Sequence, residues 1–173
     1  MTLDFRRIKS PRTENIDCSG KIVGGRIYWK LYSIENILRI ILCSILSIQH
    51  PSHEAWWEDV LDKKRKDNAN FRKSQHLSLS WKSSRGNHGI YYVDIKDLVE
   101  IMRNTQGLLS PVIGDVDGWM TKIEGIRMPR NVVAHMNFPT RDDQRQINSL
   151  YKEVIDLLKN LQTKTDIKFI APL

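Results

Sequence analysis

The chain has 173 residues, of which 40% are hydrophobic and 27% are charged. That composition is typical of a folded globular protein and excludes an intrinsically disordered chain, and the length fits one domain. The 27 Lys and Arg residues against 20 Asp and Glu give a net charge of +7. Such a charge suits a polyanionic partner, but many basic proteins bind no nucleic acid, so charge alone does not assign one.

The cysteines and the apolar stretches indicate where in the cell the protein is expected. Cys18 and Cys43 are 25 positions apart with no paired spacing, which is typical of reduced thiols and predicts a cytoplasmic protein. The longest apolar stretch, Ile37–Ile48, has 12 residues and contains Arg39. Because it is shorter than a membrane-spanning helix and too far from the start for a signal peptide, we expect no membrane partner.

Three regions follow one another along the chain. Residues 1–25 contain Pro11 and the loop-like stretch CSGKIVGG, which predicts an irregular or short extended lead-in. Residues 26–165 carry the helical patterns and are expected to form a single domain. Residues 166–173 are interpreted as a C-terminal tail.

The first helix is predicted from Ile27 to about His50, because apolar residues recur at spacings of three and four. Isoleucines fill much of the remaining circumference, so this helix is either central in its bundle or shared with a partner subunit. Pro51 ends it, and Ser52 is expected to cap a second helix of about 20 residues. That second helix turns basic through KKRKDNANFRK, which we interpret as a solvated face rather than a nucleic-acid contact.

The second half of the chain predicts three more helices. Residues 77–93 suit a loop with some extended character, and Asp94 with Asp97 is expected to cap a short third helix. After the linker SPVIGDVDG, an apolar stripe predicts a fourth helix that runs from Trp119 toward His135. Thr140 begins a capping box for a last helix that extends to about Lys164. The fold class is therefore all-α, an antiparallel bundle of four to five helices.

The stretch RNVVAH, Arg130 to His135, carries the chemistry. On a helix, Asn131 and His135 lie about 40° apart and Arg130 lies about 140° from His135, although an arginine side chain is long enough to bend round. A cation, an amide and a group that exchanges protons near neutral pH suit RNA cleavage, in which a 2′-hydroxyl loses a proton while charge grows on phosphorus. This chemistry requires no metal or cofactor. The same spacing also fits an ordinary helix end, with His135 facing the backbone and Arg130 a surface cation.

The segment RMPRNVVAH resembles the signature of the HEPN superfamily (higher eukaryotes and prokaryotes nucleotide-binding), in which Arg is followed after four to six residues by His. The residue after Arg is commonly Asn, as at Asn131. The first-helix text SIENILRIIL is similar to a Glu, two residues, Leu-Arg pattern of one HEPN branch. The WW pair and the terminal amphipathic helix also match, so the resemblance covers about residues 27–162.

The resemblance implies a metal-independent endoribonuclease that works as a homodimer, with the two signatures meeting across a cleft. Arg130 would clamp the phosphate, His135 would act as general base or acid, and Asn131 would position the substrate. Glu35 and Arg39 on the first helix would be accessory groups. The family further implies a toxin or antiphage (abortive-infection) effector with a cognate antitoxin.

Pro129 departs from the family pattern. A proline within a helix removes a backbone hydrogen bond and kinks the helix, so we expect a kink that either aims Arg130 or spoils the site.

Three other functions fit parts of the sequence. The nearest alternative is a HEPN-like module that binds RNA or nucleotide without cutting, or that is an interaction module and only helps a partner assemble. A metal enzyme would use His50, His53 and Glu54, although Pro51 interrupts the helix that would align them. A DNA-binding protein would use the basic stretches, but no helix-turn-helix unit is evident. His76 and His88 are interpreted as loop or surface residues.

Overall fold

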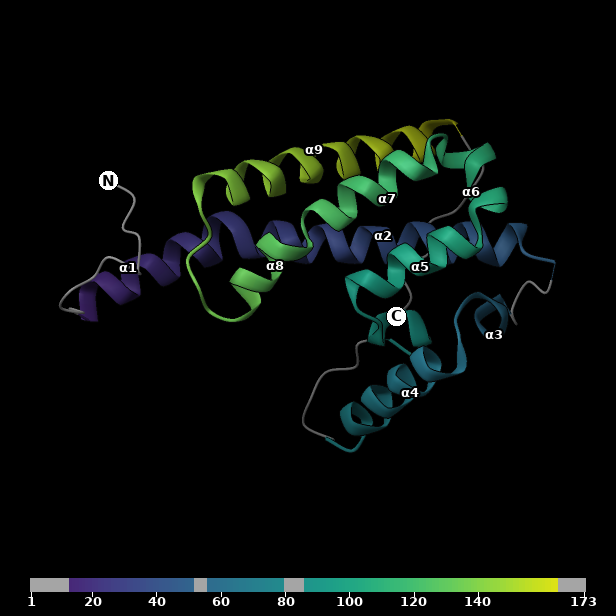
Figure 1. Cartoon of the computed structure of the whole chain (residues 1–173), viewed down its shortest axis with the longest axis horizontal. Helices are drawn as coiled ribbons and strands as arrows, with labels where there is room; N and C mark the ends of the chain where they lie inside the picture. Colours follow the sequence, from purple (N-terminus) through teal and green to yellow (C-terminus); the bar gives the residue numbers. More distant parts are fainter. Residues whose placement is uncertain (1–12, 52–55, 80–85, 165–173) are drawn as a thin grey trace.

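The computed structural model describes residues 13–51, 56–79 and 86–164, and within these segments every regular element is a helix. One long helix runs the length of the molecule, and several of the later helices pack against it (Figure 1). The all-α helical bundle expected from the sequence is therefore confirmed. The division into a lead-in, a domain and a tail is only partly covered, because residues 1–12 and 165–173 lie outside the described segments.

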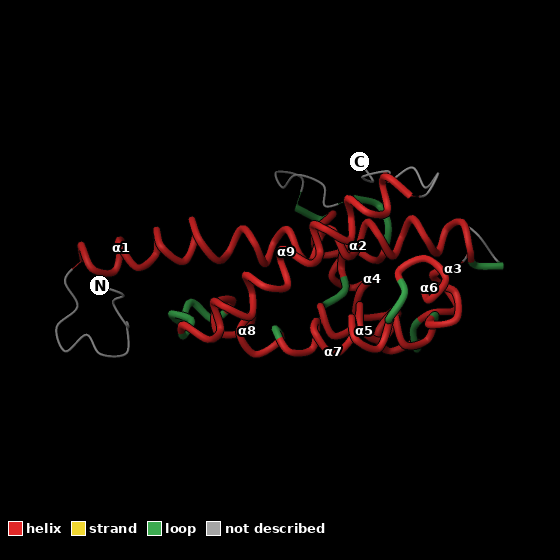
Figure 2. Tube along the Cα trace, turned by 90° about the horizontal axis from the view of Figure 1, so that it is seen from above, coloured by secondary structure: helices red, strands yellow, loops and turns green. Residues whose placement is uncertain are grey.

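The long helix is built from three consecutive elements: α1 (Thr13–Val23), the π-helical turn η2 (Gly24–Tyr28) and α2 (Trp29–Gln49). The expected irregular lead-in is therefore wrong for Thr13–Val23. The backbone at Val23 and Trp29 stays in the right-handed helical region on either side of η2, so the helix passes through the glycine pair without a break. Figures 1 and 2 both show α1 projecting beyond the other helices.

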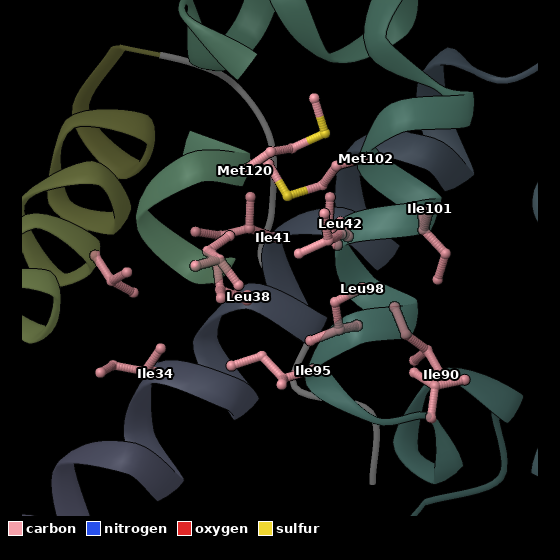
Figure 3. Packing of buried hydrophobic residues seen from close by; sticks show 14 of the residues in the cluster. Ile34, Leu38, Ile41, Leu42, Ile90, Ile95, Leu98, Ile101, Met102 and Met120 are labelled. Carbon is pink, nitrogen blue, oxygen red and sulfur yellow. The ribbon is translucent and has the colours of Figure 1, made fainter. Parts of the chain in front are cut away.

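The core surrounds α2. The last helix, α9 (Arg141–Lys164), makes its most extensive contacts with α2. Another side of α2 packs against the middle of the chain, where Leu38 and Leu42 meet Leu98 and Met120 (Figure 3). All four side chains are at most 8% exposed. The sequence left two explanations for the apolar first helix, a central position in its own bundle or an interface with a partner subunit. The central position accounts for its buried residues.

The same long helix meets the length and composition criteria for a membrane span. Its most apolar window within Ile16–Gln49 has a mean hydropathy of 1.6, and 39% of that window is buried inside the molecule. A core helix of a soluble protein meets these criteria as well, and α2 is the central core helix here. The absence of a membrane partner stays a prediction.

The predicted second helix is two helices, α3 (Trp56–Val60) and α4 (Lys63–Leu77). The chain breaks because Asp62 takes an extended backbone conformation and its carboxylate accepts a hydrogen bond from the Arg65 amide at 2.9 Å. This is an N-cap, and it starts a new helix. The cap expected at Ser52 lies outside the described residues.

Between α4 and α5 (Ile95–Asn104) the chain forms the 3-10 turn η4 (Gly89–Tyr92) rather than extended structure, in the described part of this connection. Asp94 and Asp97 make the predicted capping box at the start of α5. Its reciprocal bond joins the Asp94 amide to the Asp97 carboxylate at 3.1 Å.

The linker expected at residues 110–118 is much shorter, because α6 (Gln106–Ile113) and α7 (Val116–Gly125) take up most of it. The chain turns at Gly114, whose φ of 78° favours glycine. Asp115 then caps α7 by accepting a hydrogen bond from the Gly118 amide at 2.9 Å.

The predicted fourth helix is also divided, into α7 and α8 (Arg127–Ala134). A continuous helix would need the missing amide proton of Pro129 and would press its ring against the Gly125 carbonyl. In α8 the proline instead occupies the first turn, where no intrahelical donor is required, and the Arg130 amide donates to the Ile126 carbonyl at 2.8 Å. The expected kink is thus a full break at Ile126, upstream of Arg130.

The start of α9 is as predicted. The Thr140 amide donates to the Asp143 carboxylate at 2.7 Å, and the Asp143 amide donates to the Thr140 hydroxyl at 3.1 Å. This capping box fixes where the chain turns from α8 into α9.

Candidate functional site

Glu35 on α2 joins two arginines. Its Oε1 lies 3.0 Å from Nε of Arg130 on α8, and its Oε2 lies 3.0 Å from Nη2 of Arg39 one helical turn further along α2. The carboxylate is 13% exposed, Arg39 is 11% exposed and Arg130 is 30% exposed. One anion therefore serves two cations, and the cluster keeps a net charge of +1 with Arg130 as its most accessible member.

Further hydrogen bonds fix the orientation of this cluster. Arg39 donates from Nη2 to the Val93 carbonyl at 3.1 Å and from Nη1 to the Asn36 amide oxygen at 3.3 Å. Arg130 Nη1 lies 3.5 Å from the amide oxygen of Asn131. Within the described residues the other terminal nitrogen, Nη2, makes no hydrogen bond, and the side chain is 30% exposed. Arginine nitrogens of this kind can bind a phosphate oxygen.

His135 ends α8. Its amide donates to the Asn131 carbonyl at 2.9 Å, and its backbone is no longer regularly helical. Met136 follows with a φ of 59°, and the amides of Met136 and Asn137 donate to the carbonyls of Val133 and Val132 at 3.0 and 2.9 Å. This is the Schellman arrangement, in which a left-handed residue closes a helix. The glycine usual there is replaced by Met136, whose side chain is 90% exposed.

The structure brings together Glu35, Arg39, Arg130 and Asn131 but does not join His135 to them. Within the described part of the chain, the imidazole of His135 makes no hydrogen bond or ion pair, and the side chain is exposed. The Arg130 guanidinium turns toward α2 rather than round α8 toward the histidine. A site that uses both groups would need them to come from two copies or to move.

Three cations of the basic run of α4 form ion pairs within the chain. Arg65 pairs with Asp62 and with Asp97, the latter at 3.3 Å. Lys66 pairs with Glu58 at 3.1 Å, and Arg72 pairs with Asp94 at 2.9 Å. The most conspicuous charge run in the sequence therefore ties α4 to its neighbours.

His88 is not the loop or surface residue expected from the sequence. Its ring stacks on Trp56 at 4.9 Å and lies edge-on to Trp57 at 5.3 Å, while its Nδ1 accepts a hydrogen bond from the Ile90 amide at 3.2 Å. Burial, reinforced by the nearby charge of Lys73, lowers the pKa of His88. The imidazole is thus a neutral part of the packing at the start of η4.

A pocket of about 300 Å³ opens beside this histidine, lined by Trp57, Glu58, Asn70, Lys73, Asn87, His88 and Gly89. Gly89 is needed there because a Cβ at that position would lie 2.5 Å from the Trp57 ring. This pocket was not predicted from the sequence. The only sequence features that relate to it are the WW pair at residues 56–57 and the NHG stretch at residues 87–89.

Two of the three residues suggested as metal ligands, His53 and Glu54, lie outside the described residues. Within the described segments no group of three His, Cys, Asp or Glu side chains is placed to hold a metal ion. His50 lies 3.9 Å from Asp59, at Nε2 and Oδ2.

Comparison of the chain with protein-family models, with curated proteins and with solved structures found no match. The resemblance to the HEPN superfamily therefore depends on the sequence motifs at Arg130–His135 and in the first helix.

Proposed function

We propose that this chain is a metal-independent endoribonuclease of HEPN type that acts on RNA in the cytoplasm as a homodimer. The observation that supports it best is the Arg-Asn-x-x-x-His sequence on α8, whose arginine is fixed on Glu35 through Nε and is 30% exposed. A toxin or antiphage role, with a cognate antitoxin, is part of the same proposal.

In the proposed reaction, Arg130 binds the non-bridging oxygens of a phosphodiester through its terminal nitrogens. His135 removes the proton from the adjacent 2′-hydroxyl, and that oxygen attacks phosphorus. The bond from phosphorus to the 5′-oxygen breaks, and the leaving oxygen takes up a proton. The products are a 2′,3′-cyclic phosphate and a 5′-hydroxyl.

The homodimer follows from the separation of the two groups. Arg130 lies in the first turn of α8 and His135 at its end, with the guanidinium directed to α2. In a symmetric dimer, the arginine of one copy and the histidine of its partner can meet across the interface. We place the reacting phosphate there.

A second candidate is a non-catalytic RNA-binding module of the same family. It is favoured by the exposed imidazole of His135, because a general base is normally oriented by a hydrogen-bond partner, and none is present among the described residues.

The test uses purified protein and a labelled structured RNA, with and without a chelator of divalent metals. Arg130→Ala and His135→Ala should each lower the cleavage rate by about 100-fold or more. The matched controls Arg103→Ala and His76→Ala should cleave as the wild type does. Arg103 pairs with Glu100 and Glu124 at the surface, and the His76 ring lies edge-on to Tyr92.

The product ends decide the mechanism. Cyclic phosphate and 5′-hydroxyl ends that form in the presence of chelator agree with the proposal. Products with 3′-hydroxyl ends, or a strict need for a divalent metal, would reject it. Equal activity in all four variants would reveal a contaminating nuclease, and RNA binding without cleavage would favour the second candidate.

A further inference from the structure

Two tyrosines are exposed on the long helix near the Arg130 cluster, Tyr28 at the end of η2 and Tyr32 in the first turn of α2. Tyr28 is 58% exposed and Tyr32 is 64% exposed, although aromatic rings normally contribute to a core. The neighbouring Trp29 is itself 41% exposed, and its ring lies edge-on to Tyr151 of α9 at 4.9 Å. At about 100° per residue, Tyr28 and Tyr32 lie about 60° to 100° round the helix from Trp29.

The tyrosines lie in line with the cluster. From Tyr28 onward, at about 100° per residue, Tyr32, Glu35 and Arg39 all fall within about 60° of arc on one face of the helix. Tyr28 and Tyr32 are separated by about 6 Å along the axis, and Glu35 follows less than one turn later. The face thus leads from two exposed rings directly to the carboxylate that holds Arg130.

Hydrogen bonds connect the two parts of this face. The Asn36 side-chain amide donates to the Tyr32 carbonyl at 2.8 Å, and its oxygen accepts from Arg39 at 3.3 Å. Arg39 in turn binds Glu35, which binds Arg130. The helical turn that carries Tyr32 is therefore rigidly connected to the arginine.

The charge around this face is positive. Glu35 is shared by Arg39 and Arg130, so the cluster at the end of this face keeps a net charge of +1. This net positive charge attracts a polyanion.

We infer that Tyr28 and Tyr32 form a stacking platform for two unpaired bases of single-stranded RNA, next to the phosphate bound by Arg130. This inference rests on the proposed function for its ligand class. Every base has a flat face that stacks on an aromatic ring, so the platform would select unpaired strands rather than a sequence. It assigns single-stranded loops or ends as the substrate of the site.

The test measures binding and not cleavage, so that its result does not depend on the nuclease proposal. A fluorescein-labelled RNA of about 12 nucleotides, fully 2′-O-methylated to prevent cleavage, is titrated with the full chain and followed by anisotropy. Tyr28→Ala and Tyr32→Ala should each weaken binding by about 5- to 150-fold, while Tyr28→Phe and Tyr32→Phe should bind as the wild type does. The same RNA annealed to its complement should bind more weakly than the single strand.

Phe71→Ala is the matched control, because Phe71 is an exposed aromatic residue on α4, 61% exposed and outside this face. Circular dichroism checks that each variant folds. Unchanged affinity in both alanine variants, loss in the phenylalanine variants, or no binding by the wild type would overturn the inference. A change in oligomeric state with unchanged RNA affinity would show instead that the face binds a second copy.

Discussion

The α4 lobe (α3, α4 and η4) and the α8 end of the bundle carry the same kinds of side chain but place them differently. In the lobe, Arg72 pairs with Asp94 and His88 is stacked on Trp56. At the α8 end, Arg130 shares one carboxylate with Arg39, and His135 is exposed. In the described part of the lobe each arginine pairs with a carboxylate of its own, whereas at the α8 end one carboxylate serves two arginines.

This difference teaches that a run of cations in a sequence does not locate a binding surface. The decisive quantity is the balance of acidic and basic groups at each place in the fold. In the described part of the lobe, Arg65 and Arg72 each have a carboxylate within ion-pair distance, which reduces the field that these two arginines present to a partner. At the α8 end, the exposed side chains of Arg26 and Arg127 have no such partner in the described segments. Their positive charge is therefore not neutralised by a neighbouring carboxylate there.

The largest effect is expected from removing the aromatic support of the lobe. Trp56 is 1% exposed and carries the stacked His88, so Trp56→Ala should lower the free energy of unfolding by about 3–5 kcal/mol. Urea denaturation followed by circular dichroism measures this loss. Phe71→Ala in the same lobe should stay within about 0.5 kcal/mol of the wild type. Similar losses in both variants would contradict the packing described for Trp56.

The next effect compares one carboxylate from each region. Glu35→Gln leaves two guanidiniums without their shared anion and should cost about 1–3 kcal/mol, because a hydrogen-bonded charge is lost from a nearly buried site. Glu58→Gln breaks only the exposed pair with Lys66, which should cost at most about 1 kcal/mol. RNA cleavage should also fall about 10-fold in Glu35→Gln, because Arg130 is no longer held in position. Equal free energies of unfolding in the two variants would contradict the claim that Glu35 holds Arg39 and Arg130 together.

A pH effect is expected in the lobe. Burial lowers the pKa of His88 in the folded protein, so below its ordinary value of about 6.5 the unfolded chain binds more protons than the folded one. Stability should therefore decrease as the pH falls below about 6.5, until His88 is protonated in the folded state as well. His88→Gln should remove this part of the pH dependence, as measured by urea denaturation between neutral and mildly acidic pH. An unchanged pH profile in the variant would contradict the prediction.

The smallest effect concerns the left-handed residue in each region. Met136→Gly should stabilise the protein by about 0.5–1 kcal/mol, since relief of the left-handed strain exceeds the entropy cost of glycine. Gly86→Ala should do the reverse, because Gly86 has a φ of 101° and a Cβ there would lie 2.9 Å from the Tyr91 ring. Thermal unfolding of the two variants measures both changes. A loss of stability in Met136→Gly would show that the methionine side chain contributes packing at the end of α8.

Local features of the fold could be predicted from the sequence. The capping boxes at Asp94 and Thr140 are encoded within four residues, so both were found. The breaks at Asp62 and Ile126 were missed because an aspartate and a proline are each compatible with a continuing helix until the neighbouring packing is known. The periodicity of α1 is obscured by Ser19 and Gly20 and by the glycine pair that follows it.

The candidate site could be predicted only in part. The motif on α8 was visible in the sequence, and the resemblance suggested that Glu35 and Arg39 take part. The bond from Glu35 to Arg130 joins residues 95 positions apart, and only the packing of α8 on α2 brings these two residues together. The burial of His88 likewise depends on two tryptophans that precede it by about 30 positions. Such contacts depend on tertiary structure and leave no local pattern.

The most direct test of the central claim is a complementation experiment with the two site variants. Arg130→Ala and His135→Ala are purified separately, mixed under conditions that exchange subunits, and assayed for RNA cleavage. If the site is composed of the arginine of one copy and the histidine of its partner, the inactive variants should together recover roughly a quarter of the wild-type rate, since half of the dimers are mixed and each retains one complete site. Failure to recover any activity, with mixed dimers present, would contradict the composite site.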